Sequence, residues 1–393
     1  MAQVNSVAVQ LRLVHGGLNC LVFSVCYLLA GSMAQRQAIS RSIALPFEIH
    51  IPFLPWLVLP YLSSWLFFCL AFFAVRSPDA LRVLSHRLLL ATVLGCLVFV
   101  LYPVYFGGPR PAVQPGVSAV FFDLLGLLDR PYNQCPSLHV AFCLLLWPSL
   151  RDAMAPSWHR PLLATWLGLT AASTLFTYQH HLLDVVGGAL LGWACLRWIR
   201  PGRTEPQVAF YYAIAGGVAA IVGIATEHAV LGLYLAGSLC LVSLAYARGD
   251  RQFLHKHNGR HPWWICCLYA PYLLGYRLSW RAVVWRERRQ PPCKQIGPQL
   301  WIGRRLSPAE AAQLPPDCSV IDLANELAET RSLRSHRYQY VPLLDIVAPP
   351  AAVVQDIVAA IRCETAAGHT VYLHCAMGYR RCVQIANAYL ASV

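Results

Sequence analysis

Long apolar stretches separated by short polar segments dominate the first 250 residues. Eight of these stretches are candidates for helices that cross a bilayer, which requires about 20 residues each, although the fourth is short for a span. They lie at residues 13–33, 53–75, 88–106, 136–150, 161–179, 181–199, 207–226 and 229–247. A further apolar segment at 116–128 is shorter and more interrupted, so we expect it to lie on the membrane surface or to re-enter from one side. The pattern predicts an all-α polytopic membrane domain with about eight transmembrane helices over residues 1–250.

Arginine placement predicts the orientation of these helices. Arginines gather in the loops at 76–87, 151–160 and 197–203, whereas the alternate loops hold fewer. Because cytoplasmic loops carry an excess of basic residues, we expect these three loops and both termini to lie in the cytoplasm.

Residues 251–290 form a basic, aromatic linker. Within it, 262–280 is apolar and rich in Trp and Tyr, so the sequence leaves eight or nine spans open. Basic clusters flank this segment on both sides and Pro271 interrupts it. Both features favour a helix at the membrane interface over a ninth span.

The pattern changes after residue 290. Short β-rich runs alternate with runs of helical periodicity up to the last residue. This alternation predicts a small α/β domain over residues 291–393, on the cytoplasmic side.

Composition supports the membrane interpretation. The chain is 57% hydrophobic and 12% charged, and its net charge of +13 comes almost entirely from arginine. A basic chain can bind nucleic acid, but the apolar spans place these arginines in cytoplasmic loops, so we expect no nucleic-acid partner. Most of the 15 cysteines lie in apolar stretches, where cysteine behaves as a small hydrophobic residue. We see no metal-ligand spacing among them and expect no metal or other cofactor.

The segment YLHCAMGYRRC (372–382) carries a candidate phosphate site. A β-rich run ends at His374 and a helical run begins near Cys382, so the backbone N–H groups of the loop between them would bind an anion at a helix start. The same field lowers the pKa of Cys375 and makes its thiolate a nucleophile, while Arg381 can grip two phosphate oxygens. The loop residues expected to bind phosphate are Ala376, Met377, Gly378, Tyr379 and Arg380.

This motif resembles the H-C-x-x-G-x-x-R signature of the dual-specificity, protein-tyrosine-phosphatase-like family, over about residues 295–393. The resemblance implies that Asp345, on an upstream loop, protonates the leaving oxygen; an exposed loop carboxylate without a catalytic role is the alternative. Two departures are that Cys382 stands where the family has Ser or Thr, and that the chain stops soon after the last helical run. They imply slow turnover, lower stability or a sensing role.

A second candidate site comes from two polar motifs in the membrane domain, NQCPSLHVAF (133–142) and STLFTYQHHLLDVVGG (173–188). Both lie at outward-facing ends of predicted helices, and ionisable residues at membrane depth are functional candidates. His180 and Asp184 are four residues apart, so they share one helical face. The carboxylate can orient the imidazole, and His139 can donate a proton to a leaving group.

Ser137 and the helix start beside it are expected to bind phosphate oxygens. His181 also faces Asp184 from a neighbouring angle, which leaves the choice between the two adjacent histidines open from spacing alone.

These motifs resemble the type 2 phosphatidic acid phosphatase superfamily over roughly residues 50–200, and most closely its branch of inositol phosphorylceramide and sphingomyelin synthases. The resemblance implies a six-helix core in which His180 attacks phosphorus to form a phosphohistidine, Asp184 orients it and His139 is the acid. The broader superfamily has more basic residues in these motifs. Here Arg110 alone remains, and it is expected to bind phosphate.

The two resemblances together predict a bifunctional integral membrane phosphatase or phosphotransferase that acts on lipid phosphates and has a cytoplasmic cysteine-dependent phosphatase domain. The alternative is a membrane-anchored phosphate sensor with a weakly active or inactive tail. The sequence does not decide whether the membrane site hydrolyses lipid phosphates or transfers headgroups. It also leaves open whether the tail binds a phosphoprotein or a phosphoinositide. The fused architecture implies a bacterial inner membrane, with the histidine site outside and the C-terminal domain in the cytoplasm.

Overall fold

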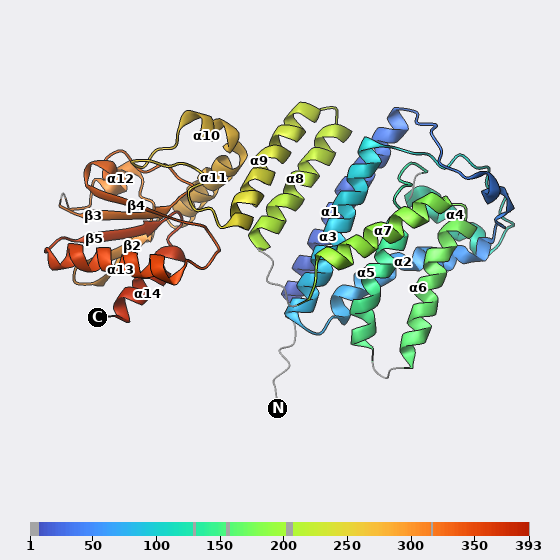
Figure 1. Cartoon of the computed structure of the whole chain (residues 1–393), viewed down its shortest axis with the longest axis horizontal. Coiled ribbons are helices and arrows are strands. Elements are labelled where there is room, and N and C mark those ends of the chain that lie inside the picture. The colour runs from blue at the N-terminus through green and yellow to red at the C-terminus, as the bar shows by residue number, and fades with distance from the viewer. Residues whose placement is uncertain (1–7, 129–130, 155–157, 202–206, 316, 393) are drawn as a thin grey trace. The chain divides into compact units, whose positions relative to one another are not determined.

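The computed structural model describes residues 8–128, 131–154, 158–201, 207–315 and 317–392, with the backbone only at 127 and 128. The chain divides into two compact units. The first comprises Met1–Glu205 with Ile214–Ala236, and the second Pro206–Ala213 with Gly237–Val393. Figure 1 labels the elements of both.

The first unit is helical. Its elements are α1 (Val9–Arg36), the 3-10 helices η1 (Pro46–His50) and η2 (Pro55–Leu57), α2 (Val58–Ala74), α3 (Pro78–Leu101), α4 (Val117–Leu128), α5 (Leu138–Ala153), α6 (His159–Phe176), α7 (Leu182–Trp198), and most of α8 (Gln207–Ala225) with the start of α9 (Ala229–Arg248). Helix α4 occupies the segment expected to form a surface or re-entrant helix.

Five helices among the described residues are long and apolar enough to cross a membrane: α1, η2 together with α2, α3, α8 and α9. The remaining three predicted spans correspond to α5, α6 and α7, which have 16, 18 and 17 residues. By length and apolar composition, five of the described helices qualify as spans, so the predicted count of about eight is not confirmed. Several long apolar helices nevertheless support an integral membrane protein.

Two glycines bring α5 and α7 close together. A Cβ on Gly188 would lie 2.2 Å from the carbonyl oxygen of Ser137, and one on Gly192 would lie 3.1 Å from that of Ala141. Larger residues would push the helices apart, as at other small-residue helix contacts in membranes. The contact holds the start of α5, where CPSLH lies, against the start of α7.

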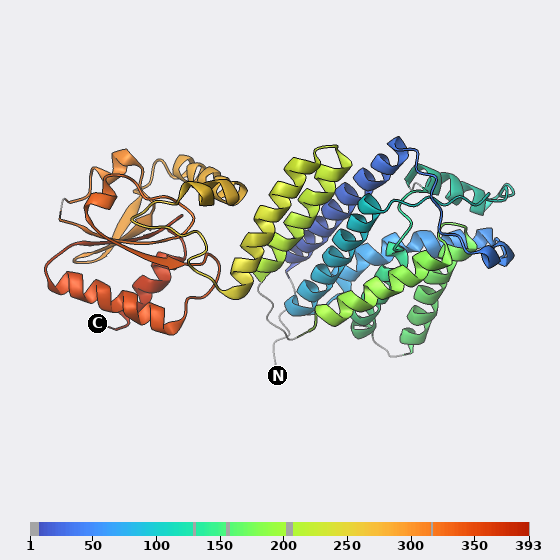
Figure 2. The same ribbon diagram turned by 45° about the horizontal axis from the view of Figure 1, so that its top comes forward.

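The second unit ends in a five-stranded sheet with strand order β1-β2-β5-β3-β4. Its elements are α10 (Trp263–Leu268), α11 (Ala270–Arg286), β1 (Cys293–Gly297), β2 (Leu300–Arg304), α12 (Pro308–Ala311), β3 (Ser319–Ala324), η3 (Leu333–Ser335), β4 (Arg337–Leu343), α13 (Ala351–Ala366), β5 (Val371–Cys375) and α14 (Arg381–Leu390). Only β1 runs antiparallel to its neighbour. Figures 1 and 2 both show α13 and α14 on one face of the sheet.

The central strand β5 explains where the C-terminal motif lies. It is fully buried between β2 and β3, as its apolar residues predict. Residues that follow a parallel strand lie at its carboxyl edge, where open α/β sheets bind ligands. The segment 262–280, expected at the membrane interface, forms the short helix α10 and most of α11.

Two candidate phosphate sites

The two polar motifs of the membrane domain meet at the starts of α5 and α7. His139 is in the first turn of α5, and its ring centroid lies 6.0 Å from that of His180. His180 Nδ1 lies 3.4 Å from Asp184 Oδ2. The three residues predicted to act together are therefore neighbours, and His180 and Asp184 are buried.

Several polar atoms at this position lack hydrogen bonds. Ser137 Oγ, His180 Nδ1 and Asp184 Oδ1 are buried without a partner in the described part of the chain. The separation of 3.4 Å between His180 and Asp184 is too long for a good hydrogen bond, but catalytic hydrogen bonds often shorten only when substrate binds. Buried polar atoms without partners are costly, so this cluster has the character of a ligand site.

A cavity of about 320 Å³ opens beside the two histidines. Its wall is mostly apolar and is supplied by four helices besides His180 and Asn133: α1, α2, α4 and α5. Phe23 and Tyr27 of α1 stack in this wall, with ring centroids 5.0 Å apart. An apolar cavity beside polar groups has room for an apolar chain next to a polar headgroup.

Arg110 lies near the loop before His180. Its guanidinium donates a hydrogen bond of 3.3 Å to the carbonyl oxygen of Tyr178 and lies 5.1 Å from the ring centroid of Phe122. Its assignment to phosphate binding therefore stays a prediction.

Glu48 is a site residue that sequence reasoning missed. Its Oε2 lies 2.6 Å from His181 Nδ1, and its Oε1 accepts a hydrogen bond of 3.1 Å from the backbone N–H of Leu182. His181 also stacks on Phe106, with ring centroids 4.4 Å apart. The contacts tie His181 to Glu48, while His180 faces His139. A signal existed in the sequence, because Glu48 is the only acidic residue before Asp79.

In the second unit, the loop after β5 forms the cradle that the C-terminal motif predicts. Gly378 has φ of +80°, and a Cβ there would lie 2.8 Å from the backbone nitrogen of Arg304. Only glycine fits this position without strain. The Cys375 sulfur accepts hydrogen bonds from the backbone N–H groups of Gly378 and Cys382.

The charge state of Cys375 depends on Cys382. Their sulfur atoms lie 3.6 Å apart, and the Cys382 sulfur also lies 3.5 Å from the carbonyl oxygen of Gly303, so its single S–H can donate to that carbonyl or, when Cys375 is ionised, to the thiolate. This thiol, with Arg381 and the two amides, outweighs burial and holds the pKa of Cys375 well below the ordinary thiol value. The thiol of Cys382 is thus placed where a hydroxyl could donate to an ionised Cys375.

Arg381 is buried and held from one side. Its terminal nitrogens bind both carboxylate oxygens of Glu326 at 3.1–3.2 Å, and one of them also donates to the carbonyl oxygens of Leu323 and Leu343. Burial acts to lower the pKa of Arg381, but Glu326 and Asp345 outweigh it and raise that pKa. Nε has no hydrogen bond among the described residues. This edge of the guanidinium faces Asp345 Oδ1 at 3.4 Å, so an incoming phosphate would bind it beside that carboxylate.

Asp345 lies beside Arg381, and its role as the acid stays a prediction. It follows β4 in a turn, its Oδ1 lies 3.4 Å from Arg381 Nε, and its Oδ2 accepts a hydrogen bond of 2.9 Å from Tyr276. The next residue, Ile346, has φ of +64°. A β-branched residue in this region is strained, and such strain gathers at functional loops.

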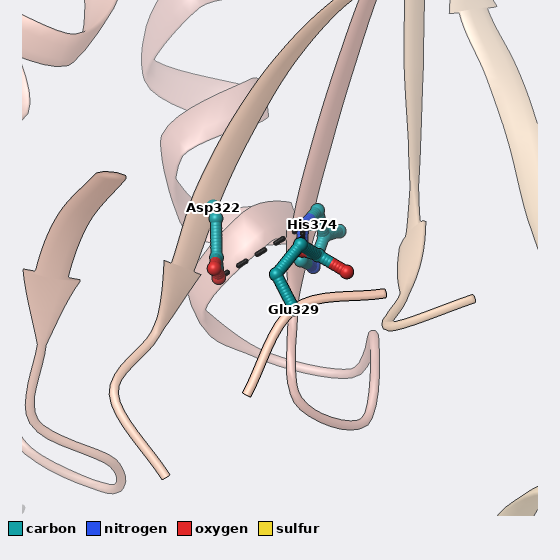
Figure 3. A group of neighbouring side chains, drawn as sticks. All are labelled: Asp322, Glu329 and His374. Atoms are coloured by element: carbon teal, nitrogen blue, oxygen red, sulfur yellow. Dashed lines mark ion pairs between the residues drawn. The ribbon is translucent and has the colours of Figure 1, made fainter. Parts of the chain in front are cut away.

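His374 lies in a buried charge cluster behind the cradle. Asp322 stands opposite it on β3, and Glu329 Oε2 lies 2.8 Å from His374 Nε2 (Figure 3). The donor atoms of the three residues lie within 4.8 Å of one another, a grouping that can hold a cation. Lys256 Nζ, however, lies 2.6 Å from Asp322 Oδ2. Burial acts to lower the pKa of His374, but Glu329 and Asp322 outweigh it and raise that pKa.

Comparison with known proteins adds one finding. Residues 56–198 match the family model described as PAP2 superfamily. The PAP2 match contains Arg110, Ser137, His139, His180 and Asp184. Members of the PAP2 superfamily are phosphatases, so the match supports a lipid-phosphatase-type activity in the membrane unit. It ends before the sheet and leaves out Glu48. No curated protein and no solved structure matches the chain.

Proposed function

We propose that the chain is a bifunctional membrane enzyme that cleaves phosphoric esters of lipids at His180 and phosphomonoesters at Cys375. One observation carries the first half: His139, His180 and Asp184 converge beside an apolar cavity, within the segment that matches the PAP2 superfamily. The site therefore combines a nucleophile, its orienting carboxylate and an acid with room for a lipid tail.

At the histidine site, Asp184 faces Nδ1 of His180 and leaves Nε2 to attack phosphorus. The ester oxygen leaves as the P–O bond breaks, and protonated His139 gives it a proton. Water, deprotonated by the now neutral His139, then hydrolyses the phosphohistidine and releases phosphate. An alcohol in place of water gives headgroup transfer at the same site.

The direct test measures phosphate release from phosphatidic acid by the full-length protein in vesicles. His180→Ala should reduce release to background, and His139→Ala should lower it by about 10²–10⁴-fold. His50→Ala, at an exposed histidine, is the matched control and should keep full activity. Full activity of His180→Ala would refute the proposed nucleophile. Adding an alcohol acceptor and analysing the products separates hydrolysis from transfer.

At the cysteine site, the Cys375 thiolate attacks phosphorus and Asp345 protonates the leaving oxygen. Water then cleaves the thiophosphate, and the Cys382 thiol stabilises the departing sulfur. The arrangement that supports this half is the Cys375 sulfur in the cradle, where it accepts hydrogen bonds from the backbone N–H groups of Gly378 and Cys382, together with Arg381 Nε and Asp345 Oδ1, which lie 3.4 Å apart.

Cys382 stands where the dual-specificity family has a Ser or Thr hydroxyl. This difference favours the second candidate, a phosphate sensor with little turnover. Hydrolysis of p-nitrophenyl phosphate by the full-length His180→Ala protein distinguishes the two. The rate should disappear in Cys375→Ser and persist in Cys363→Ser, which alters an exposed cysteine on α13. Equal rates in both variants would favour the sensor.

A further inference from the structure

Helix α11 has two apolar faces. One face packs inward through four residues spaced along the helix: Tyr272, Tyr276, Trp280 and Val283. The opposite face carries Leu274, Leu278 and Trp285, at spacings of four and seven, and these side chains are 54%, 54% and 69% exposed. A helix that is apolar on opposite faces ordinarily has a neighbour on both.

Helix α10 extends this exposed surface. Trp263 is 78% exposed, and Trp264 and Leu268 are also exposed. We define the outer face as Trp263, Trp264, Leu268, Leu274, Leu278 and Trp285. Exposed tryptophans and leucines on two consecutive helices are typical of elements that lie in a membrane interface.

Helices α10 and α11 pack against two helices that are candidate membrane spans. In the same compact unit, Tyr269 and Tyr272 belong to one buried cluster with Ala209 of α8 and with Val242 and Tyr246 of α9. Helices α8 and α9 are both long and apolar enough to span a membrane. The cluster therefore attaches α10 and α11 to the ends of two candidate spans.

Charge on α11 fits an anionic lipid surface. Arg277 and Arg281 are exposed along the helix, and Arg288 and Arg289 are exposed just beyond its end. The acidic residue in this stretch, Glu287, accepts a hydrogen bond from Tyr379. Basic side chains beside an apolar face attract anionic headgroups.

The inward face of α11 contacts the cysteine site directly. The Tyr276 hydroxyl donates to Asp345 at 2.9 Å, and Trp280 Nε1 donates to the carbonyl oxygen of Arg305 at 2.8 Å. The same two aromatic residues pack against the buried cluster of Ala324, Leu327 and Ala376, against which Met377 of the cradle also packs. Helix α11 thus contacts Asp345 and the cradle on one side and carries the outer face on the other.

We propose that the outer face binds the surface of an anionic bilayer and that the Cys375 site acts on phosphomonoesters carried by lipids in that bilayer. Contact with the membrane holds α11, and α11 holds Asp345 and the cradle at the level of the headgroups. This inference rests on the proposed phosphatase function of Cys375 and names the source of its substrate.

The test uses full-length protein carrying His180→Ala, so that the histidine site does not contribute. In anionic vesicles, the variant Leu278→Ser/Trp285→Ser should hydrolyse a lipid phosphomonoester at least about fivefold more slowly, while the rate on soluble p-nitrophenyl phosphate stays unchanged. Arg281→Gln should slow the lipid reaction about fivefold in anionic vesicles, the scale of one basic residue near such a surface, and have no effect in neutral ones. Leu390→Ser, at an exposed leucine of α14, is the control and should change neither rate.

A second measurement reports membrane contact without catalysis. Lipids brominated near the headgroup should quench part of the tryptophan fluorescence, and that part should be smaller in Trp285→Phe. An equal quenched fraction in Trp285→Phe and the parent protein, or equal rates of the Leu278→Ser/Trp285→Ser variant and the parent on the lipid substrate, would overturn the proposal. Cross-linking between two copies through α11 would assign the outer face to a second chain instead. If Cys375→Ser keeps both activities while quenching persists, the proposed phosphatase function fails and the membrane contact stands.

Discussion

The two candidate phosphate sites, the histidine site and the cysteine site, are built from different kinds of side chains. In the membrane unit, two imidazoles and one carboxylate stand beside an apolar cavity, and polar atoms of Ser137 and Asp184 have no hydrogen bonds among the described residues. In the second unit, Arg381, Lys256 and His374 are buried with carboxylate partners. Charge at membrane depth is expensive, and the first site holds one carboxylate, Asp184, beside two imidazoles that can be neutral. In the second unit each of these buried groups has a carboxylate beside it, which offsets part of the cost of burying charge.

This contrast predicts the largest effect for the orienting carboxylate of the histidine site. Asp184→Asn keeps the shape but loses the charge that orients His180, so release of phosphate from phosphatidic acid should fall about 10⁴-fold, the scale seen when a histidine loses its orienting carboxylate. Hydrolysis of p-nitrophenyl phosphate through Cys375 should not change. A fall in both rates would show that the two sites are not separate.

The paired charges of the cysteine site predict a stability effect. Glu326→Ala leaves buried Arg381 without its carboxylate, and the free energy of unfolding of the second unit should decrease by about 3–5 kcal/mol. Thermal or denaturant unfolding in detergent measures the change. The control, Glu364→Ala, removes a partly exposed pair with His369 and should cost at most about 1 kcal/mol. Equal effects would contradict the account of Arg381.

The cysteine site should also show a pH dependence that the histidine site does not share. Cys382→Ala removes a donor to the thiolate, so the pKa of Cys375 should rise by about one to two units. The acid limb of the pH profile of kcat/KM for p-nitrophenyl phosphate then moves to higher pH by the same amount. Cys382→Ser keeps a donor and should restore most of the original profile. An unchanged acid limb in Cys382→Ala would mean that the thiol does not tune Cys375.

The smallest effect concerns Glu48, which lies outside the PAP2 match. Glu48→Gln weakens the contact with His181 and the cap on α7, so release of phosphate from phosphatidic acid should fall about tenfold, as expected for about 1–1.5 kcal/mol from one hydrogen bond. His181→Asn, which removes the imidazole of the same pair, should have an effect of similar size. A loss as large as that of Asp184→Asn would instead place Glu48 and His181 in the chemistry.

The sequence predicted the parts of the molecule that depend on local patterns. Apolar periodicity indicated a helical membrane portion followed by a small sheet region, and residues 56–198 match the PAP2 superfamily model, as the resemblance of their motifs implied. The motif CPSLH and the spacing of His180 and Asp184 anticipated which residues come together, because each motif lies at a helix start. The catalytic roles stay predictions.

The parts that sequence could not predict depend on distant contacts. Glu48 reaches His181 across 133 residues, and Glu326 reaches Arg381 across 55; neither pair belongs to one periodic element. The predicted count of about eight spans is not confirmed, for a different reason. Helices α5 and α7 begin only after their polar motifs, which shortens them relative to the apolar stretches of the sequence.

The proposal of two phosphate sites on opposite sides of one membrane can be tested by a single labelling measurement. A membrane-impermeant maleimide is added to sealed right-side-out vesicles that contain Ala112→Cys, an exposed position in the loop with Arg110, and labelled peptides are mapped by mass spectrometry. The account predicts labelling at residue 112 in intact vesicles and at the exposed native Cys363 only after the vesicles are opened. Labelling of both positions from the same side would contradict it.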